Sequence, residues 1–257
     1  PQKKMKMLFS RKYKSPLLAA FFLGGVMLSA CDPDILNEKP KDFFSTENAY
    51  TDPQTIQLAI NTLYADARNF IYNDNGSQNG GYPYREYLRM GTDIATVGQK
   101  HRPYLLVDFR LFNSTHEAST YFWNKAYQTL IPRSNAIIDY AEKPEVPWNS
   151  EEQKKQVLAQ VRFFRAYAYY NLVNLYGDVP LITREILVPE FDFVRAPKNE
   201  VLQFIREDLE YASANLPANP DQVREGELTQ AAADMLLATL YLQLEAYDLA
   251  IQTTSRI

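Results

Sequence analysis

The stretch SEEQKKQVLAQVRFFRAYAYYNLVNLYG, residues 150–177, predicts the clearest helix of the chain. Ser150 and Gln153 have the spacing of a capping box, in which two side chains satisfy amide groups that would otherwise be orphaned at a helix start. Gly177 and Pro180 mark the end, because glycine favours the position after a helix and proline cannot continue one. Between them, apolar residues recur at helical spacing: Val157, Val161, Phe164, Ala168, Leu172 and Leu175. The stretch therefore predicts a long helix with one buried face.

Similar spacing predicts helices on both sides of this one. One begins at Asp52-Pro53, where a capping residue precedes a proline in the first turn. The others are expected over residues 117–142, 198–215 and 229–244, with a last one beginning near Tyr247. The best strand candidates, residues 105–112 and 179–187, are both short. The predicted fold class is therefore all-α, or predominantly so.

Residues 231–242 and 247–250 look like one tetratricopeptide unit, because alanines let two antiparallel helices approach while leucine and tyrosine fill the gaps. Any tightly packed helical pair is the alternative. The helices at 150–176 and 198–215 could form an earlier, looser unit with residues 176–197 as an insertion. A second long insertion, residues 72–116, carries five of the nine glycines. Loops of this length are usually functional or disordered.

The single cysteine, Cys31, follows a basic segment and then an uncharged one. Six basic residues and no acidic one lie between residues 3 and 14, and residues 15–30 carry no charge. A membrane span needs roughly 20 apolar residues, so this pattern indicates a secretory signal rather than an anchor. Leu28-Ser29-Ala30-Cys31 resembles the bacterial lipobox, in which the thiol is lipidated and the leader removed. An ordinary buried cysteine is the alternative reading.

These features predict a lipoprotein signal over residues 1–30, a lipidated tether over 31–45 and a helical domain over 46–257. All 31 acidic residues but only 21 of the 27 basic ones lie after Ala30, so the processed chain carries a net charge of about −10. Nucleic acid is not an expected partner, because phosphate binding needs clustered lysine and arginine. With Cys31 lipidated, no thiol is left for a disulfide.

Catalytic and metal-binding patterns are missing from the sequence. His101 and His116 lie fifteen residues apart without neighbouring ligands, which is not a zinc spacing. No HExxH, GxSxG, P-loop or GxGxxG motif is present. We expect a protein that is not an enzyme and has no metal or cofactor. A helical glycosidase that uses two carboxylates is the less favoured alternative.

Taken together, the motifs resemble the SusD/RagB family of outer-membrane lipoproteins of Bacteroidota. The resemblance covers essentially the whole mature chain. It rests on the lipobox and on EKP at 38–40, NAY at 48–50, TD at 92–93, WNKAY at 123–127, NAII at 135–138, RFFRAY at 162–167, LYGDVPL at 175–181, DL at 208–209 and the helix at 231–241.

The resemblance implies a SusD-like α-α superhelix of tetratricopeptide-like hairpins with long inserted loops. Family members lie at the cell surface over a TonB-dependent, SusC-like transporter and capture oligosaccharides, starch-like or other, or in some cases peptides. It also implies that a larger C-terminal region is missing here, so that residues 46–257 are an N-terminal domain. A surface-anchored scaffold that binds proteins through its tetratricopeptide groove is the remaining alternative.

Sugar capture calls for aromatic rings that pack against pyranose faces and for polar side chains that meet hydroxyl groups. We expect these contacts in the long insertion, from Tyr82, Tyr84, Arg102, Tyr104, Phe112 and Asn113. A second group of aromatic residues lies within predicted helices, where packing is the expected role: Trp123, Tyr127, Phe163, Tyr167 and Tyr170. Arg162 and Arg165 flank the apolar face of the 150–176 helix, and we expect structural ion pairs or helix contacts from them.

Overall fold

The structure is a computed structural model that describes residues 50–72, 113–114 and 117–257. Its helices are α3 (Pro53–Tyr72), α5 (Glu117–Lys125), α6 (Ile131–Ala141), α7 (Glu151–Tyr176), α8 (Lys198–Asn215), α9 (Gln230–Gln243) and α10 (Tyr247–Thr254). A π-helical turn, Ala126–Leu130, joins α5 to α6, and a 3₁₀ turn, Pro220–Gln222, precedes α9. The predicted helices are confirmed, and so is the predominantly α fold class.

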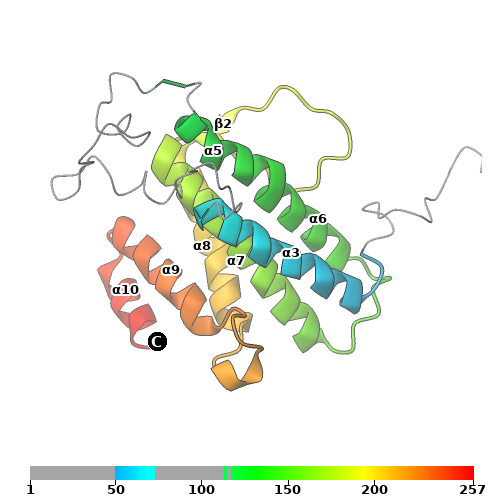
Figure 1. Cartoon of the computed structure of the whole chain (residues 1–257). Helices are drawn as coiled ribbons and strands as arrows, with labels where there is room; N and C mark the ends of the chain where they lie inside the picture. The colour runs from blue at the N-terminus through cyan, green and yellow to red at the C-terminus, as the bar shows by residue number, and fades with distance from the viewer. Residues whose placement is uncertain (1–49, 73–112, 115–116) are drawn as a thin grey trace, which may run out of the picture. The chain divides into compact units, whose positions relative to one another are not determined.

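Helix α7 is the element against which most of the other helices pack. It contacts α8 along one side and α6, α3 and α5 along others, while α9 packs on α8 and α10 on α9 (Figure 1). The connection from α9 to α10 is only three residues long, so these two helices form a tight hairpin. Successive hairpins of this kind are the tetratricopeptide-like arrangement that the sequence predicts.

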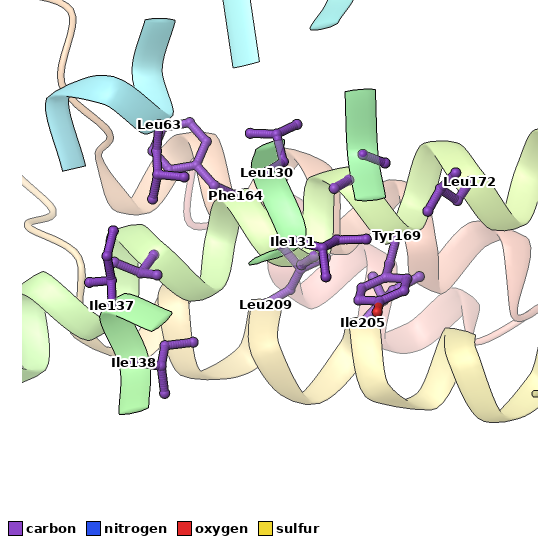
Figure 2. Close-up of a cluster of buried hydrophobic side chains, with 14 of the residues drawn as sticks. Leu63, Leu130, Ile131, Ile137, Ile138, Phe164, Tyr169, Leu172, Ile205 and Leu209 are labelled. Atoms are coloured by element: carbon purple, nitrogen blue, oxygen red, sulfur yellow. The ribbon is translucent and has the colours of Figure 1, made fainter. Parts of the chain in front are cut away.

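The core lies where α3, α6, α7 and α8 meet. Figure 2 shows apolar side chains from these helices directed toward one another, among them Leu63, Ile137, Phe164, Leu172 and Leu209. All five are buried. Burying one such side chain contributes about 1.5–3 kcal/mol relative to leaving it exposed, so these contacts supply the main driving force for packing the helices.

Both ends of α7 have the local chemistry expected of them, with one difference. The Ser150 hydroxyl accepts a hydrogen bond from the Gln153 amide at 3.1 Å. The Gln153 side chain accepts from the amide of Asn149 at 3.1 Å, one residue before the amide that a capping box would use. Gly177 ends the helix at a φ of 73°, a left-handed conformation that costs glycine little.

The helix predicted over residues 117–142 is continuous but changes its hydrogen bonding at Ala126–Leu130. There the Ile131 amide donates to the carbonyl of Ala126, five residues earlier. The next residue, Pro132, has no amide hydrogen to donate to the carbonyl four residues earlier. The extra residue of the π turn rotates the side chains of α6 about the helix axis relative to those of α5. Side chains of both helices line a groove beside them.

The strand predicted over residues 179–187 is wrong in its extent. Only Val179–Pro180 (β1) pairs, with Arg195–Ala196 (β2) in antiparallel register. Residues 181–194 form a loop between the two strands, drawn in yellow beside β2 in Figure 1. The strand stops because helix side chains, rather than another strand, satisfy the next backbone groups. The other candidate strand, residues 105–112, lies outside the described residues.

Among the helices described, none is long and apolar enough to cross a membrane.

Candidate ligand-binding groove

An open groove of about 750 Å³ lies between the α5–α6 segment and the 181–194 loop. We call it the α6 groove and define it by six of the residues that line it: Trp123, Tyr127, Arg133, Ile182, Phe193 and Arg195. Its volume is in the range of small-molecule binding sites, about 300–1,000 Å³. Most of its surface is apolar. The groove therefore has the size and character of a ligand site.

Aromatic residues of α5 and the π turn form one wall of the groove. The rings of Trp123 and Tyr127 are tilted with centroids 4.9 Å apart, and Tyr176 meets Trp123 edge-on at 5.3 Å. The Tyr127 hydroxyl donates to the carbonyl of Pro180 at 2.6 Å, and burial raises the pKa of this phenol. Tyr127 therefore stays neutral and holds β1 in place. The packing role expected for Trp123 and Tyr127 is confirmed, but both residues also face the groove.

A buried polar cluster lies directly behind the groove. We call it the Arg165 cluster; it consists of Arg165, Asp208 and Asn135, which are all at most 5% exposed. Arg165 donates from Nε and Nη2 to the two carboxylate oxygens of Asp208 at 2.8 and 2.9 Å. Its Nη1 donates to the side-chain oxygen of Asn135 at 2.9 Å. The ion-pair role expected for Arg165 is confirmed, and the cluster ties α6, α7 and α8 together.

Asn135 connects this cluster to the opposite wall of the groove. Its amide nitrogen, oriented by Arg165, donates to the carbonyls of Ile182 and Arg184 at 2.9 and 3.1 Å. Tyr169 of α7 bonds both backbone groups of Ile182, donating to its carbonyl at 2.9 Å and accepting from its amide at 2.7 Å. These bonds replace a strand ladder. Residues 182–184 are thus positioned by helix side chains rather than by a sheet.

The other arginine that flanks α7 contributes away from the groove. Arg162 lies 3.6 Å from a carboxylate oxygen of Glu142 and 4.1 Å above the ring centroid of Tyr211. It therefore links the end of α6 and the face of α8 to α7. This confirms the helix-contact role expected for it.

Three arginines line the groove, and they differ in their partners. Arg133 pairs with Asp66 of α3, and Arg184 pairs with Glu190 at 2.7 Å. Arg195 lies with its guanidinium 5.9 Å from the ring centroid of Trp123. Within residues 50–72, 113–114 and 117–257, no carboxylate lies within ion-pair distance of Arg195. Among the described arginines of the groove, Arg195 is therefore the one that lies beside an aromatic ring and has no carboxylate partner.

The structure describes one of the six residues predicted to bind ligand, Asn113. Tyr82, Tyr84, Arg102, Tyr104 and Phe112 lie outside the described residues, as do His101, His116 and Cys31. Asn113 is exposed, and its carbonyl accepts from the Ser119 hydroxyl at 2.7 Å. Ligand binding by these six residues stays a prediction. No group of three or more His, Cys, Asp or Glu side chains that could hold a metal occurs in the part of the chain that is described.

Three other helical aromatics confirm the packing role expected for them. Phe163 and Tyr167 stack with their ring planes 7° apart, and Tyr167 also meets the buried ring of Phe70 edge-on. Tyr170 is half-buried against the same core. They do not line the α6 groove.

The sequence did not reveal Phe193 and Arg195 as groove residues. They follow no regular pattern and lie more than fifty residues from the aromatic wall along the chain. A signal did exist for the Arg165 cluster, because Asn135, Arg165 and Asp208 each belong to a different one of the family-like motifs. That these three motifs meet in space is not visible in the sequence.

Comparison with known proteins identifies the chain. A family model described as "Starch-binding associating with outer membrane" matches residues 86–242, which is more than half of the chain. The chain belongs to the SusD-like family. This SusD-like chain is 30% identical over 213 residues to a SusD-like protein of Formosa agariphila, covering 80% of this chain and 39% of the relative. It is 27% identical over 220 residues to a SusD-like protein of Bacteroides ovatus, covering 84% and 37%.

A solved structure gives the same result for the fold. A laminarin-binding SusD-like protein superposes with a TM-score of 0.63 at 25% identity, over 78% of this chain and 42% of that protein. The SusD-like chain thus spans about 40% of the length of these relatives. The family resemblance seen in the sequence is confirmed.

Proposed function

We propose that this SusD-like protein binds glycans at the outer cell surface and delivers them to a TonB-dependent transporter. The observation that carries the proposal is the family match over residues 86–242, a family described as starch-binding and associated with the outer membrane. The similarity to a laminarin-binding protein across 78% of the chain supports it. The proposed role is capture rather than catalysis.

The chemistry of the α6 groove agrees with glycan capture. A sugar ring has apolar C–H faces, which pack on aromatic rings such as Phe193, whose side chain is 44% exposed in the groove. It also has hydroxyl groups, which need donors and acceptors such as Arg184 and Gln128 of the groove lining. A mostly apolar groove with a few polar groups is the usual composition of a ligand site.

Surface attachment is proposed from the sequence. Residues 1–30 would be removed, and Cys31 would carry the lipid that holds a tether over residues 31–45 to the outer membrane. One acyl chain binds membranes only marginally, so the two or three chains of a bacterial lipoprotein would be needed for stable attachment. The SusC-like transporter is the proposed partner, to which the anchored protein would pass its ligand.

Glycan retention on affinity gels tests the proposal. We expect the protein to be retarded by a gel that contains laminarin or another polysaccharide, compared with a gel without polysaccharide. Phe193→Ala should reduce the retardation, because it removes the most exposed ring of the α6 groove. Phe191→Ala is the matched control, since Phe191 is 91% exposed in the same loop and does not line the groove.

The outcomes separate the alternatives. If no polysaccharide retards the wild-type protein, glycan capture is wrong. Release of reducing sugar would favour a glycosidase, and retention of a peptide alone would favour a RagB-like peptide binder or a scaffold. If Phe193→Ala binds as well as wild type, the sugar binds outside the α6 groove, and the residues predicted in the 72–116 insertion become the first candidates.

A further inference from the structure

We propose that the α6 groove selects acidic glycans, with a carboxylate or sulfate group of the ligand paired to Arg195. The inference rests on the proposed glycan-binding function and adds the chemical class of the ligand. It starts from the three arginines of the groove: two have carboxylate partners, and the third has none among the residues that the structure describes.

The environment of Arg195 favours an anionic ligand. Arg133 and Arg184 are paired with Asp66 and Glu190. Glu185 is the carboxylate among the described lining residues, and it forms no ion pair with Arg195. Arg195 therefore presents a guanidinium that no protein carboxylate neutralises within the described ranges, at the edge of a largely apolar groove.

The position of Arg195 is well defined by the backbone. It belongs to β2, where it pairs with Pro180 of β1, and the Tyr127 hydroxyl bonds the Pro180 carbonyl at 2.6 Å. Its guanidinium is also placed over the Trp123 ring, 5.9 Å from the centroid. A cation held beside Trp123 and Phe193 can meet the anionic group of a sugar whose ring packs on the apolar surface.

Guanidinium chemistry suits this class of ligand. Arginine presents a planar fork of donors that matches a carboxylate or a sulfate with two parallel hydrogen bonds, and such charge-assisted bonds are about twice as strong as neutral ones. A neutral sugar would gain only ordinary hydrogen bonds from the same group.

The acidic character of the whole chain does not prevent this. The formal net charge is −4, and about −10 once residues 1–30 are removed, but charges more than about 10 Å away are largely screened at 0.1 M salt. Only the groups next to the ligand count at close range, and among the described arginines of the groove Arg195 is the one without a carboxylate partner.

Calorimetric titration with three oligosaccharides of matched length tests the inference: a uronate oligomer from alginate, a sulfated galactan oligomer and a neutral laminarin oligomer. We expect at least one acidic oligomer to bind at least 10-fold more tightly than laminarin at 0.15 M salt. The two acidic ligands distinguish a carboxylate from a sulfate as the group recognised.

Three variants isolate the role of Arg195. Arg195→Gln should weaken binding of the acidic oligomer about 10- to 100-fold, the loss expected for a charge-assisted hydrogen bond. It should weaken laminarin binding much less, because glutamine can still donate an ordinary hydrogen bond. Arg195→Lys keeps the charge without the planar fork and should lose less. Lys155→Gln, which removes one exposed positive charge of α7 outside the groove, should bind like wild type. Far-ultraviolet circular dichroism checks that each variant is folded.

The results keep this inference separate from the proposed function. If laminarin binds as tightly as both acidic oligomers, the inference is wrong but glycan capture stands. If Arg195→Gln weakens all three ligands equally, Arg195 is a general contact and not a selector, which also overturns the inference. If none of the oligomers binds and the polysaccharide gels do not retard the protein either, both proposals fail.

Discussion

Replacing Asp208 with asparagine should destabilise the protein by about 3–5 kcal/mol, the cost of leaving one partner of a buried ion pair uncompensated. The Asp208 carboxylate accepts two hydrogen bonds from Arg165, at 2.8 and 2.9 Å. The two side chains are 3% and 6% exposed, so water cannot solvate the guanidinium once the negative charge is gone. Asparagine has nearly the same shape, so the change removes charge with little change in packing.

The measurement is the free energy of unfolding from urea titrations, together with the midpoint of thermal unfolding. For a domain of 150–250 residues, 1 kcal/mol corresponds to about 2–4 °C, so the expected loss is roughly 6–20 °C. Glu190→Gln is the matched control, because it also replaces a carboxylate in an ion pair with arginine. The Arg184 side chain of that pair is 62% exposed, and exposed pairs contribute about 0–1 kcal/mol.

A double replacement tests the electrostatic reasoning further. Arg165→Met with Asp208→Leu removes both charges and should be less damaging than Asp208→Asn alone, since apolar pairs of similar volume often replace buried ion pairs at little cost. If Asp208→Asn and Glu190→Gln both cost under 1 kcal/mol, the Arg165 cluster does not hold α6, α7 and α8 together. If the double variant is the least stable, packing and not charge is the main contribution of the cluster.

Three further predictions address the core, the pH dependence and the anchor. Leu172→Ala should cost about 2–5 kcal/mol in urea unfolding, because Leu172 is fully buried. Leu175→Ala should cost much less, because Leu175 is 41% exposed at the end of the helix, although its spacing predicted a buried position; equal losses would contradict the observed burial. Burial raises the pKa of the Tyr64 phenol to about 12, so the folded state favours the neutral phenol. The stability that this phenol contributes is present below pH 10 and is lost as the pH rises from 10 to 12. Between pH 9 and 11, Tyr64→Phe should therefore lose about 1 kcal/mol less stability than wild type, and parallel losses would count against this assignment. Cys31→Ser should move the protein from the membrane fraction to the soluble fraction of the cells, and an unchanged distribution would refute lipidation as the anchor.

The helices could be predicted because the signals that specify them are local. Capping side chains, helix-ending glycine and apolar spacing act within a few residues of one another, as at Ser150, Gln153 and Gly177. The bounds of α7, Glu151–Tyr176, therefore agree with the prediction over residues 150–176. The π turn before Pro132 was missed, because the apolar spacing continues through it and only the hydrogen-bond pattern changes.

The sequence by itself determined the helical class, the family and the likeness of three motifs to known proteins, because each of these depends on neighbouring residues. Only the tertiary structure decided that Asn135, Arg165 and Asp208 form one buried cluster and that this cluster positions Ile182. Only the structure, too, brought the 181–194 loop against α6 to make a groove. The physical reason is that burial, ion pairing and cavity shape arise between helices that are distant along the chain, and no local pattern specifies which side chains will meet.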